Sequence, residues 1–234
     1  MSHALRSIAF VAELIHQPAR HEPKVLQKLH SELFGDAAAS YRDFRLIPGG
    51  AQLSNTAATA LPGQPVSCAN ILADRVQVRE EQTGTSRDDF RSRTDEIARA
   101  CLGNVPGEVF LAQQFTVRSV VNLHTSEDSR SFMLGGLFGF EPTQLVGFPG
   151  EPSLAGMRFT FGPDASAGGG IFNVRIESFA QDNRSLFLET IGTWPKPVNE
   201  EALGALAERF DATYAFQEEK LVAFVSQFDS EGEA

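Results

Sequence analysis

The sequence predicts an α+β fold made of two pseudo-repeated β-α-β-β-(β)-α halves, with antiparallel sheets and helices packed on one face. A short repeated motif is the first observation behind this prediction: Leu33-Phe34-Gly35 precedes Pro48-Gly49, and later Leu137-Phe138-Gly139 precedes Pro149-Gly150. The elements expected around each copy also follow the same order. An internal repeat of this kind constrains the whole fold, because each copy is expected to form the same structural unit.

Length and composition set the broad class. The 234 residues suffice for a sizeable core, and we expect halves at 1–107 and 108–234, packed closely enough to be one domain. The 19 Phe against 2 Tyr and 1 Trp favour a packed interior over a Tyr-rich recognition surface. The net charge of −10 argues against general nucleic-acid binding and against attachment to anionic lipid.

The first half begins with a strand and a helix. Residues 7–16 are dense in Ile, Phe, Val and Leu, which predicts a strand covered on both faces and therefore central in its sheet. Pro23 suits the first turn of a helix, because the N–H that proline lacks has no partner there. Leucines at helical spacing then predict a helix that ends near Gly35.

The rest of the first half contains two strands and a helix. Residues 43–47 form a short strand before the Pro48-Gly49-Gly50 turn, and Gln52-Leu53 begin a return after it. Residues 55–65 are expected to form a surface loop. Residues 71–80 alternate apolar and polar side chains, as a strand with one wet face does. Ser86 and Asp89 predict the capped start of a helix that buries Phe90.

The second half opens with the counterpart of the first strand. Residues 109–124 predict a long central strand, with Phe115 and Val117 on one face and Arg118 on the other. Residues 126–138 predict a helix that Gly135 and Gly136 weaken by about 1 kcal/mol each. Alternation predicts a strand over 157–161, followed by a glycine-rich connector.

The chain closes with a hairpin and a helix. Residues 171–179 and 186–194 predict adjacent strands joined through Asp182-Asn183. Asn199 is placed to cap a last helix whose apolar residues run from Leu203 to Phe228. The pattern leaves open whether this helix is continuous or breaks near Asp211.

Few residues carry recognisable chemistry. The sequence contains no phosphate-binding loop, no nucleophile elbow, no zinc-protease helix and no C-x-x-C pair. Cys68 and Cys101 stand far apart, and we expect two reduced thiols. No signal peptide and no membrane-spanning stretch is readable, so we expect a cytoplasmic protein. Because no binding motif is present, we expect neither a metal nor a cofactor.

Four arginines form the most specific pattern. They occupy the polar phase of apolar strands, and guanidinium groups on one sheet face would form a local surface for a carboxylate, a phosphate or an acidic partner segment. These are Arg79, Arg118, Arg158 and Arg175. The alternative is a solvated ion-pair lattice with Glu80, Glu81, Glu177 and Glu189.

Histidines and carboxylates offer weaker candidates. His16, His21 and His30 are spaced in a way that does not complete a metal site, so we expect surface histidines. His124, at the end of the second long strand, is a candidate acid or base. Carboxylates on or between the last strands form another acid/base candidate; they are Glu177, Asp182 and Glu189.

The layout resembles a sporadically distributed, functionally uncharacterised bacterial protein family of about 250 residues. The resemblance rests on the first strand and helix, on Asp74-Arg75-Val76-Gln77-Val78 before the Phe90 helix, on the Arg118 strand, and on the final hairpin and helix. Residues 52–70 and the glycine-rich loop depart from the family. The resemblance implies the fold and no activity.

Two classes of function follow. The first is a non-catalytic binding or interaction module, a subunit of a bacterial multi-protein assembly that binds another protein, itself or a small anionic ligand. The second is an enzyme with its site at the seam between the halves, near His124 and Arg118. A deep pocket with perturbed titratable groups would favour the enzyme, whereas a flat sheet face or a large apolar patch would favour the module.

Overall fold

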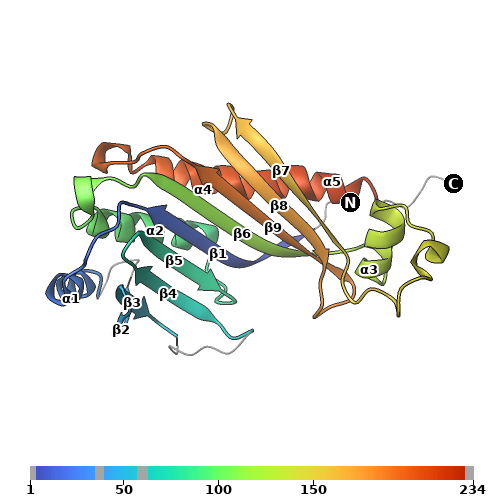
Figure 1. The fold of residues 1–234 in the computed structure, drawn as a ribbon, viewed down its shortest axis with the longest axis horizontal. Helices are drawn as coiled ribbons and strands as arrows, with labels where there is room; N and C mark the ends of the chain where they lie inside the picture. The colour runs from blue at the N-terminus through green and yellow to red at the C-terminus, as the bar shows by residue number, and fades with distance from the viewer. Residues whose placement is uncertain (1–3, 35–39, 57–62, 230–234) are drawn as a thin grey trace.

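The computed structural model describes residues 4–34, 40–56 and 63–229, and nine strands of that part form one antiparallel, open sheet (Figure 1). The strand order across the sheet is β2-β3-β4-β5-β1-β6-β9-β8-β7. The strands are β1 (Leu5–Ile15), β2 (Asp43–Ile47), β3 (Gly50–Ser54), β4 (Val66–Ile71), β5 (Arg75–Glu81), β6 (Ala112–Asn122), β7 (Gly156–Asp164), β8 (Gly170–Ser178) and β9 (Ser185–Trp194).

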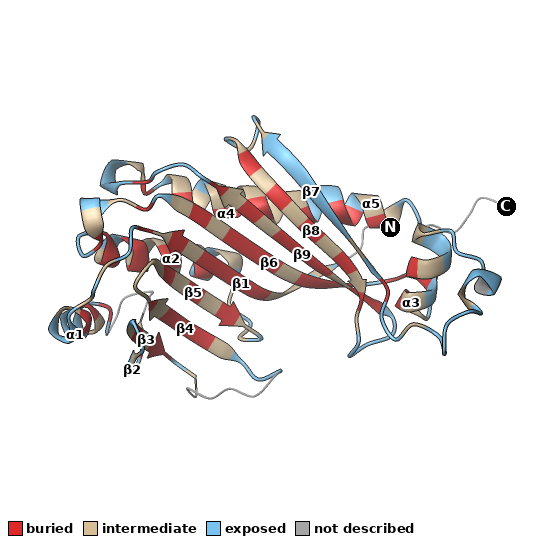
Figure 2. Ribbon diagram, in the orientation of Figure 1, coloured by how far each residue is buried: buried red, intermediate tan, exposed pale blue. Residues whose placement is uncertain are grey.

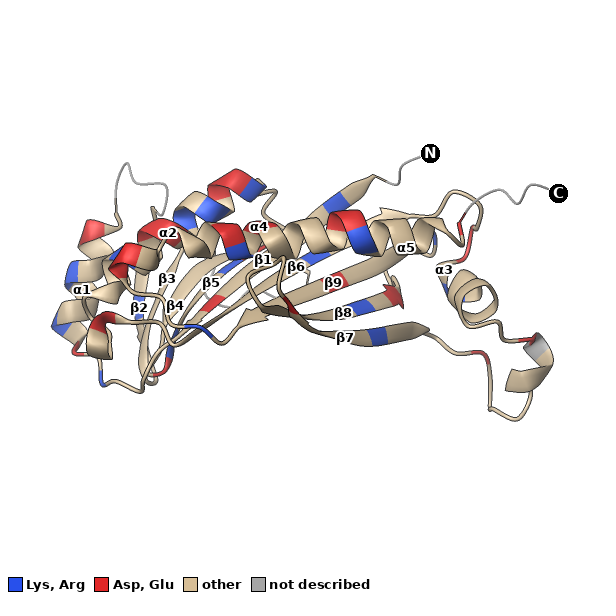
Figure 3. Ribbon diagram, turned by 90° about the horizontal axis from the view of Figure 1, so that it is seen from above, with Lys and Arg blue, Asp and Glu red and all other residues tan. Residues whose placement is uncertain are grey.

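The helices pack on one face of this sheet and leave the other face open (Figure 3). They are α1 (Pro23–Glu32), α2 (Arg87–Leu102), α3 (Ser129–Ser131), α4 (Ala205–Ala215) and α5 (Val222–Ser226). A π-helical segment, η5 (Phe216–Leu221), joins α4 to α5. The predicted α+β class with helices on one face is therefore confirmed.

The two long strands are central in the sheet, as predicted, and the structure shows that they lie side by side. Strand β1 pairs antiparallel with β5 on one side and with β6 on the other. Between this centre and the helices, Phe10, Phe90, Phe115 and Phe210 form one cluster: the Phe10 ring centroid lies 5.3 Å from that of Phe90, and the Phe210 centroid lies 6.0 Å from that of Phe115. Residues of both halves thus share one core.

The two halves also connect their strands in the same way. In each half the first strand pairs with the last strand of that half, and the intervening strands form a meander toward an edge of the sheet. The motif copies are not equivalent, because Pro48-Gly49 forms the β2–β3 turn whereas Pro149-Gly150 lies in an irregular segment before β7. Connectivity alone does not show a duplication, which stays a prediction.

The first half contains a strand that the sequence did not predict. In place of one strand over 71–80, the structure has β4 and β5, joined by a tight turn in which the Leu72 N–H donates to the Arg75 carbonyl at 2.8 Å. Strand β4 was missed because its sequence, VSCANI, has small and polar side chains that give a weak apolar signal. Part of the loop expected at 55–65 lies outside the described residues.

The predicted helices at 126–138 and after Asn199 are more irregular than expected. The first reduces to α3 followed by a π-helical turn, Phe132–Leu137. Asn199 caps only a short 3₁₀ turn, Glu200–Ala202, before α4 begins. The chain then stays helical from α4 to α5, and its irregularity falls in η5 rather than near Asp211. None of the helices in the described ranges is long and apolar enough to cross a membrane.

Candidate functional site

The four predicted arginines all project from the open face of the sheet. They alternate with residues that face the helices, such as Val78 beside Arg79 and Val117 beside Arg118. The strand register places Arg118 opposite Glu189, Glu189 opposite Arg175, and Arg175 opposite Arg158. Three of the four arginines therefore share one row that crosses four neighbouring strands.

Most of these guanidinium groups are already paired with carboxylates. Arg118 Nε lies 2.7 Å from Glu189 Oε2, and its Nη1 lies 3.3 Å from Glu81 Oε1. Arg79 reaches Glu81 at 2.9 Å, and Arg175 Nε lies 3.4 Å from Glu189 Oε1. The ion-pair lattice that was the alternative to an anion site thus describes three of the four arginines.

Arg158 differs from the other three. It is exposed on β7, the strand at one edge of the sheet, and it stands directly opposite Arg175. Among the described residues, no carboxylate lies within ion-pair distance of Arg158. Like charges directly opposite each other are unfavourable in a sheet, so Arg158 and Arg175 form an exposed cationic pair at this edge without the compensation that the other arginines have.

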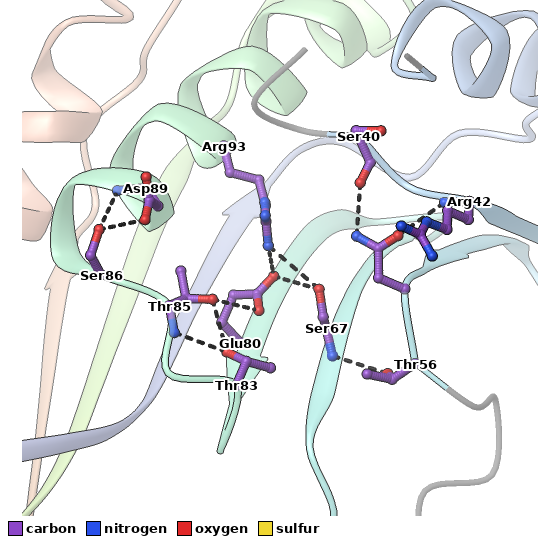
Figure 4. Close-up of polar contacts among 11 residues, drawn as sticks. Ser40, Arg42, Thr56, Ser67, Glu80, Thr83, Thr85, Ser86, Asp89 and Arg93 are labelled. Carbon is purple, nitrogen blue, oxygen red and sulfur yellow. Dashed lines mark hydrogen bonds and ion pairs between the residues drawn. The ribbon is translucent and has the colours of Figure 1, made fainter. Parts of the chain in front are cut away.

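Glu80 does not belong to this lattice, contrary to the alternative considered from the sequence. It is buried and faces the helices, where Arg93 of α2 pairs with it (Figure 4). Ser67 Oγ donates to Glu80 Oε1 at 2.8 Å, and Thr85 Oγ1 donates to Oε2 at 3.1 Å. The carboxylate is therefore saturated by donors, as a buried charge must be, and it fixes α2 on the sheet.

A second polar row on the open face was not predicted. Each residue of the row donates to the one directly opposite on the next strand, and the chain ends on the carboxylate of Glu13. The donations are Arg45 to Gln52 at 3.4 Å, Gln52 to Asn70 at 3.0 Å, Asn70 to Gln77 at 3.1 Å, and Gln77 to Glu13 at 2.7 Å. Gln114 donates to Glu13 from the other side at 3.4 Å.

The residues of the enzyme alternative are not brought together. His124 is exposed just beyond the end of β6, and its backbone N–H donates to the Asp229 carboxylate at 2.7 Å. Arg118 lies six residues earlier, which is about 20 Å along an extended strand. Glu177 and Glu189 share Arg175 as a partner, whereas Asp182 accepts from Ser185 Oγ, which lowers the pKa of Asp182.

The histidines and cysteines were the other candidates for chemistry, and the structure shows where they lie. No group of three or more His, Cys, Asp or Glu in the described part of the chain could hold a metal ion. His16 is buried rather than on the surface as expected, because β1 carries it into the fold, and its ring lies 5.8 Å from that of His21. Cys68 and Cys101 are free and buried, and burial raises the pKa of Cys101 to about 12.

A further feature is an apolar groove that the sequence did not reveal. It runs between the β7 edge and the C-terminal helix and has a volume of about 530 Å³. Its lining residues are Phe159, Phe161, Val174, Ile176, Phe216, Lys220, Leu221 and Phe224. Figure 2 shows β7 exposed along its length, beside the largely buried strands at the centre.

The phenylalanines of this groove form a chain of ring contacts. Phe216 stacks on the buried Phe172 with centroids 4.4 Å apart, and Phe161 lies 5.4 Å from Phe216. Phe159 then contacts Phe224 at 6.2 Å. Phe159 and Phe161 are nevertheless 41% and 44% exposed, so this apolar surface is only half covered.

The π-helical segment η5 determines which side chains reach the groove. Gln217 points inward and is fully buried, where its Nε2 donates to the carbonyls of Val117 and Leu188 at 3.0 and 3.3 Å. Ser119 Oγ donates to Gln217 Oε1 at 2.6 Å. This amide anchors the helix on β6 and β9, so that Phe216 lies over β8 beside the groove.

The fold and these surfaces define an α+β protein with a half-covered apolar edge. Comparison with protein-family models and with curated proteins gave no match. The family resemblance expected from the sequence therefore stays a prediction.

Proposed function

We propose that the protein is a non-catalytic binding module, a subunit of a multi-protein assembly, whose polypeptide partner covers the groove beside β7. The observation that carries this proposal is the exposure of Phe159 and Phe161 at the uncovered edge of the sheet. Contiguous exposed apolar surface is uncommon on isolated proteins and is typical of sites that bind other chains.

Two kinds of contact are available to a partner at this place. The edge of β7 offers backbone N–H and C=O groups that β8 does not use, because only one neighbour pairs with β7. The groove beside the edge accepts alternate apolar side chains of an added strand. Strand addition combines both, with backbone hydrogen bonds for affinity and side-chain pockets for specificity.

The groove is poorly suited to catalysis. Of the described residues that line it, Lys220 alone is charged, and the rest are aliphatic or aromatic. A reaction needs an acid, a base or a nucleophile held in a defined position. These side chains favour docking, and the enzyme at the seam remains the alternative.

Arg158 supports a second candidate function, the binding of a small anion. Its charge stands beside that of Arg175 on the open face, opposite to the face of the groove. We expect Arg158→Gln to abolish inorganic phosphate binding measured by calorimetry, and Arg184→Gln, on another surface, to leave it unchanged. Equal phosphate binding by Arg158→Gln and the unmodified protein would exclude this candidate.

The main proposal is tested by a photo-crosslinking amino acid introduced at Phe161 in the full-length protein inside cells. The expected result is a covalent adduct with a polypeptide, mapped by mass spectrometry to residues of the groove. The matched control is the same amino acid at Phe34, which is 57% exposed at the end of α1. Adducts that form equally at both positions, or at neither, would contradict a docking site at β7.

A further inference from the structure

We propose that the polypeptide covering β7 is a second copy of this chain, paired antiparallel through β7 about a two-fold axis at Thr160. This inference rests on the proposed function, because it uses the same groove, and it names the partner. A two-fold interface brings the same surface patch of both copies together, so the patch must be complementary to itself. The sequence and exposure of β7 meet that requirement.

The self-complementarity lies in Phe159-Thr160-Phe161, which reads the same in both directions. With the axis at Thr160, each Phe159 stands opposite Phe161 of the other copy, and the two threonines stand opposite each other. All four phenylalanines then lie on the helix side of a joined sheet, because residues directly opposite in a pair share a face. Aromatic pairs placed in this way are favourable in antiparallel sheets.

Pairing at this register would also join the two grooves. Each groove is bounded on the inner side by Phe216 and Phe224 of the C-terminal helix and is open at β7. Two copies related by the axis place these open sides against each other, so the apolar surface of one copy covers that of the other. The exposed portions of Phe159 and Phe161, 41% and 44%, are the surface that association would bury.

The polar side of β7 accommodates the same register. Arg158 stands opposite Gly162 of the other copy, and a Cβ added at Gly162 would meet no atom within 4 Å, so the site is roomy. The two copies of Arg158 lie four residues apart along the strand direction, about 14 Å. That separation exceeds the screening length of about 8 Å at physiological salt, so their mutual repulsion is small.

The β7 edge is longer than the opposite edge of the sheet. Strand β7 has nine residues, whereas β2 at the opposite edge has five. Every residue of β7 from Arg158 to Pro163 is exposed. Arg158, Pro163 and the register irregularity between Phe161 and Asp164 limit regular pairing to the middle of the strand, which is where Phe159-Thr160-Phe161 lies.

The first experiment measures the mass of the full-length protein by sedimentation. We expect a species of twice the 25.5 kDa protomer mass that dissociates on dilution, and a monomer for Phe161→Asp. Phe34→Asp, a change at an exposed phenylalanine far from β7, should remain dimeric. A monomeric unmodified protein, or a Phe161→Asp variant that stays dimeric, would overturn the inference.

A second experiment tests the register with a milder change. The Cα atoms of residues directly opposite in an antiparallel pair lie about 4.5 to 5.5 Å apart, which a disulfide can span. We therefore expect Thr160→Cys to form a disulfide-linked dimer under mild oxidation, while Cys68 and Cys101 stay buried. The control is Leu46→Cys on the other edge strand, which is 51% exposed and should stay uncrosslinked. A Thr160→Cys protein that crosslinks no more than this control would overturn the register.

The two proposals fail in distinguishable ways. A monomer whose position 161 crosslinks to a different polypeptide would remove the second copy as partner and leave the binding module intact. A monomer whose position 161 crosslinks to no polypeptide would remove both.

Discussion

Arg87 donates two hydrogen bonds to a single carboxylate oxygen of Asp211, from Nε at 3.0 Å and from Nη2 at 2.8 Å. Arg91 donates to the other oxygen at 3.0 Å, and the Arg87 guanidinium lies 4.7 Å from the centre of the Tyr214 ring. Both arginines belong to α2, in the first half of the chain, and Asp211 belongs to α4, in the second. This cluster therefore joins the halves on the helix side of the sheet.

Removing the Asp211 carboxylate should weaken the contact between α2 and α4. We expect Asp211→Ala to lower the free energy of unfolding by about 1 kcal/mol, because the paired groups are partly exposed and solvent screens them. Chemical denaturation measures the change. The control Asp95→Ala removes an ion pair within α2 alone, at 3.1 Å from Arg99, and should cost about 0.3 to 0.5 kcal/mol. Equal losses in the two variants would argue against a link between the halves.

Gly192 in β9 is required by its neighbours above the sheet. A Cβ at this position would lie 2.6 Å from the Trp194 ring and closer still to Thr213 Oγ1, well inside van der Waals contact. We expect Gly192→Ala to destabilise the protein by about 1 to 3 kcal/mol, because the packed core must shift to admit a methyl group. Thermal and urea unfolding report this loss. At Gly204 an added Cβ meets nothing, so Gly204→Ala should not destabilise; destabilisation by both changes would point to backbone effects instead.

Gln217 makes a buried hydrogen-bond cluster whose loss should be costly. We expect Gln217→Leu to lower the free energy of unfolding by about 1 to 3 kcal/mol, because Ser119 and the Val117 carbonyl lose their buried partner. The exposed neighbour Glu219 provides the control, and Glu219→Leu should change stability by less than about 0.5 kcal/mol. If Gln217→Leu were as stable as the unmodified protein, the amide would have no anchoring role.

His16 should make stability depend on pH. Burial lowers the pKa of His16 below its usual value, so the folded protein binds a proton less readily than the unfolded chain does. The contribution is fully present above pH 6.5 and is lost as the pH falls toward the folded pKa. We expect the urea midpoint to drop between pH 7.5 and pH 5.5, and the drop to shrink in His16→Gln. A drop that is unchanged in His16→Gln would contradict this assignment.

The centre of the sheet could be predicted because its signals are local. The apolar run at 7–16 and the alternation at 109–124 indicate buried strands without knowledge of their neighbours. Strand β4 could not be predicted in that way. It lies between β3 and β5, where neighbouring strands supply its hydrogen bonds, so small side chains such as Ala69 suffice.

For the arginines of the candidate site, the sequence predicts which face of the sheet they occupy, but it does not predict their ion-pair partners. Alternation correctly assigns Arg79, Arg118, Arg158 and Arg175 to one face, but register decides that three of them meet glutamates and that Arg158 does not. Glu80 shares its phase with Val76 and Val78, so the same alternation places it with the apolar face. Its charge suggested the opposite, and a partner on α2 made burial possible.

The groove had little local signal in the sequence: Pro163 in β7 is typical of an edge strand, but it lies beyond the residues that alternate. Nothing in Met157-Arg158-Phe159-Thr160-Phe161 distinguishes an edge strand from an internal one, because the distinction depends on how many neighbours the strand finds. The exposure of the two phenylalanines follows from the position of β7 at the end of the strand order. Apolar side chains that the sequence places in the core are thus partly exposed, because their strand lies at the edge of the sheet.

The central position of β1 has a consequence for synthesis on the ribosome. Phe10 pairs with Glu80 on one side and with Val117 on the other. Because both partners lie far along the chain, β1 is synthesised long before either neighbouring strand. The first half can close once β5 and α2 have emerged, but the other side of β1 then stays unpaired until β6 follows. During that interval β1 is an exposed apolar edge strand of the partly folded chain, and such an edge can pair with other chains. A synthesis rate that brings β6 promptly to β1 would therefore protect the yield of folded protein.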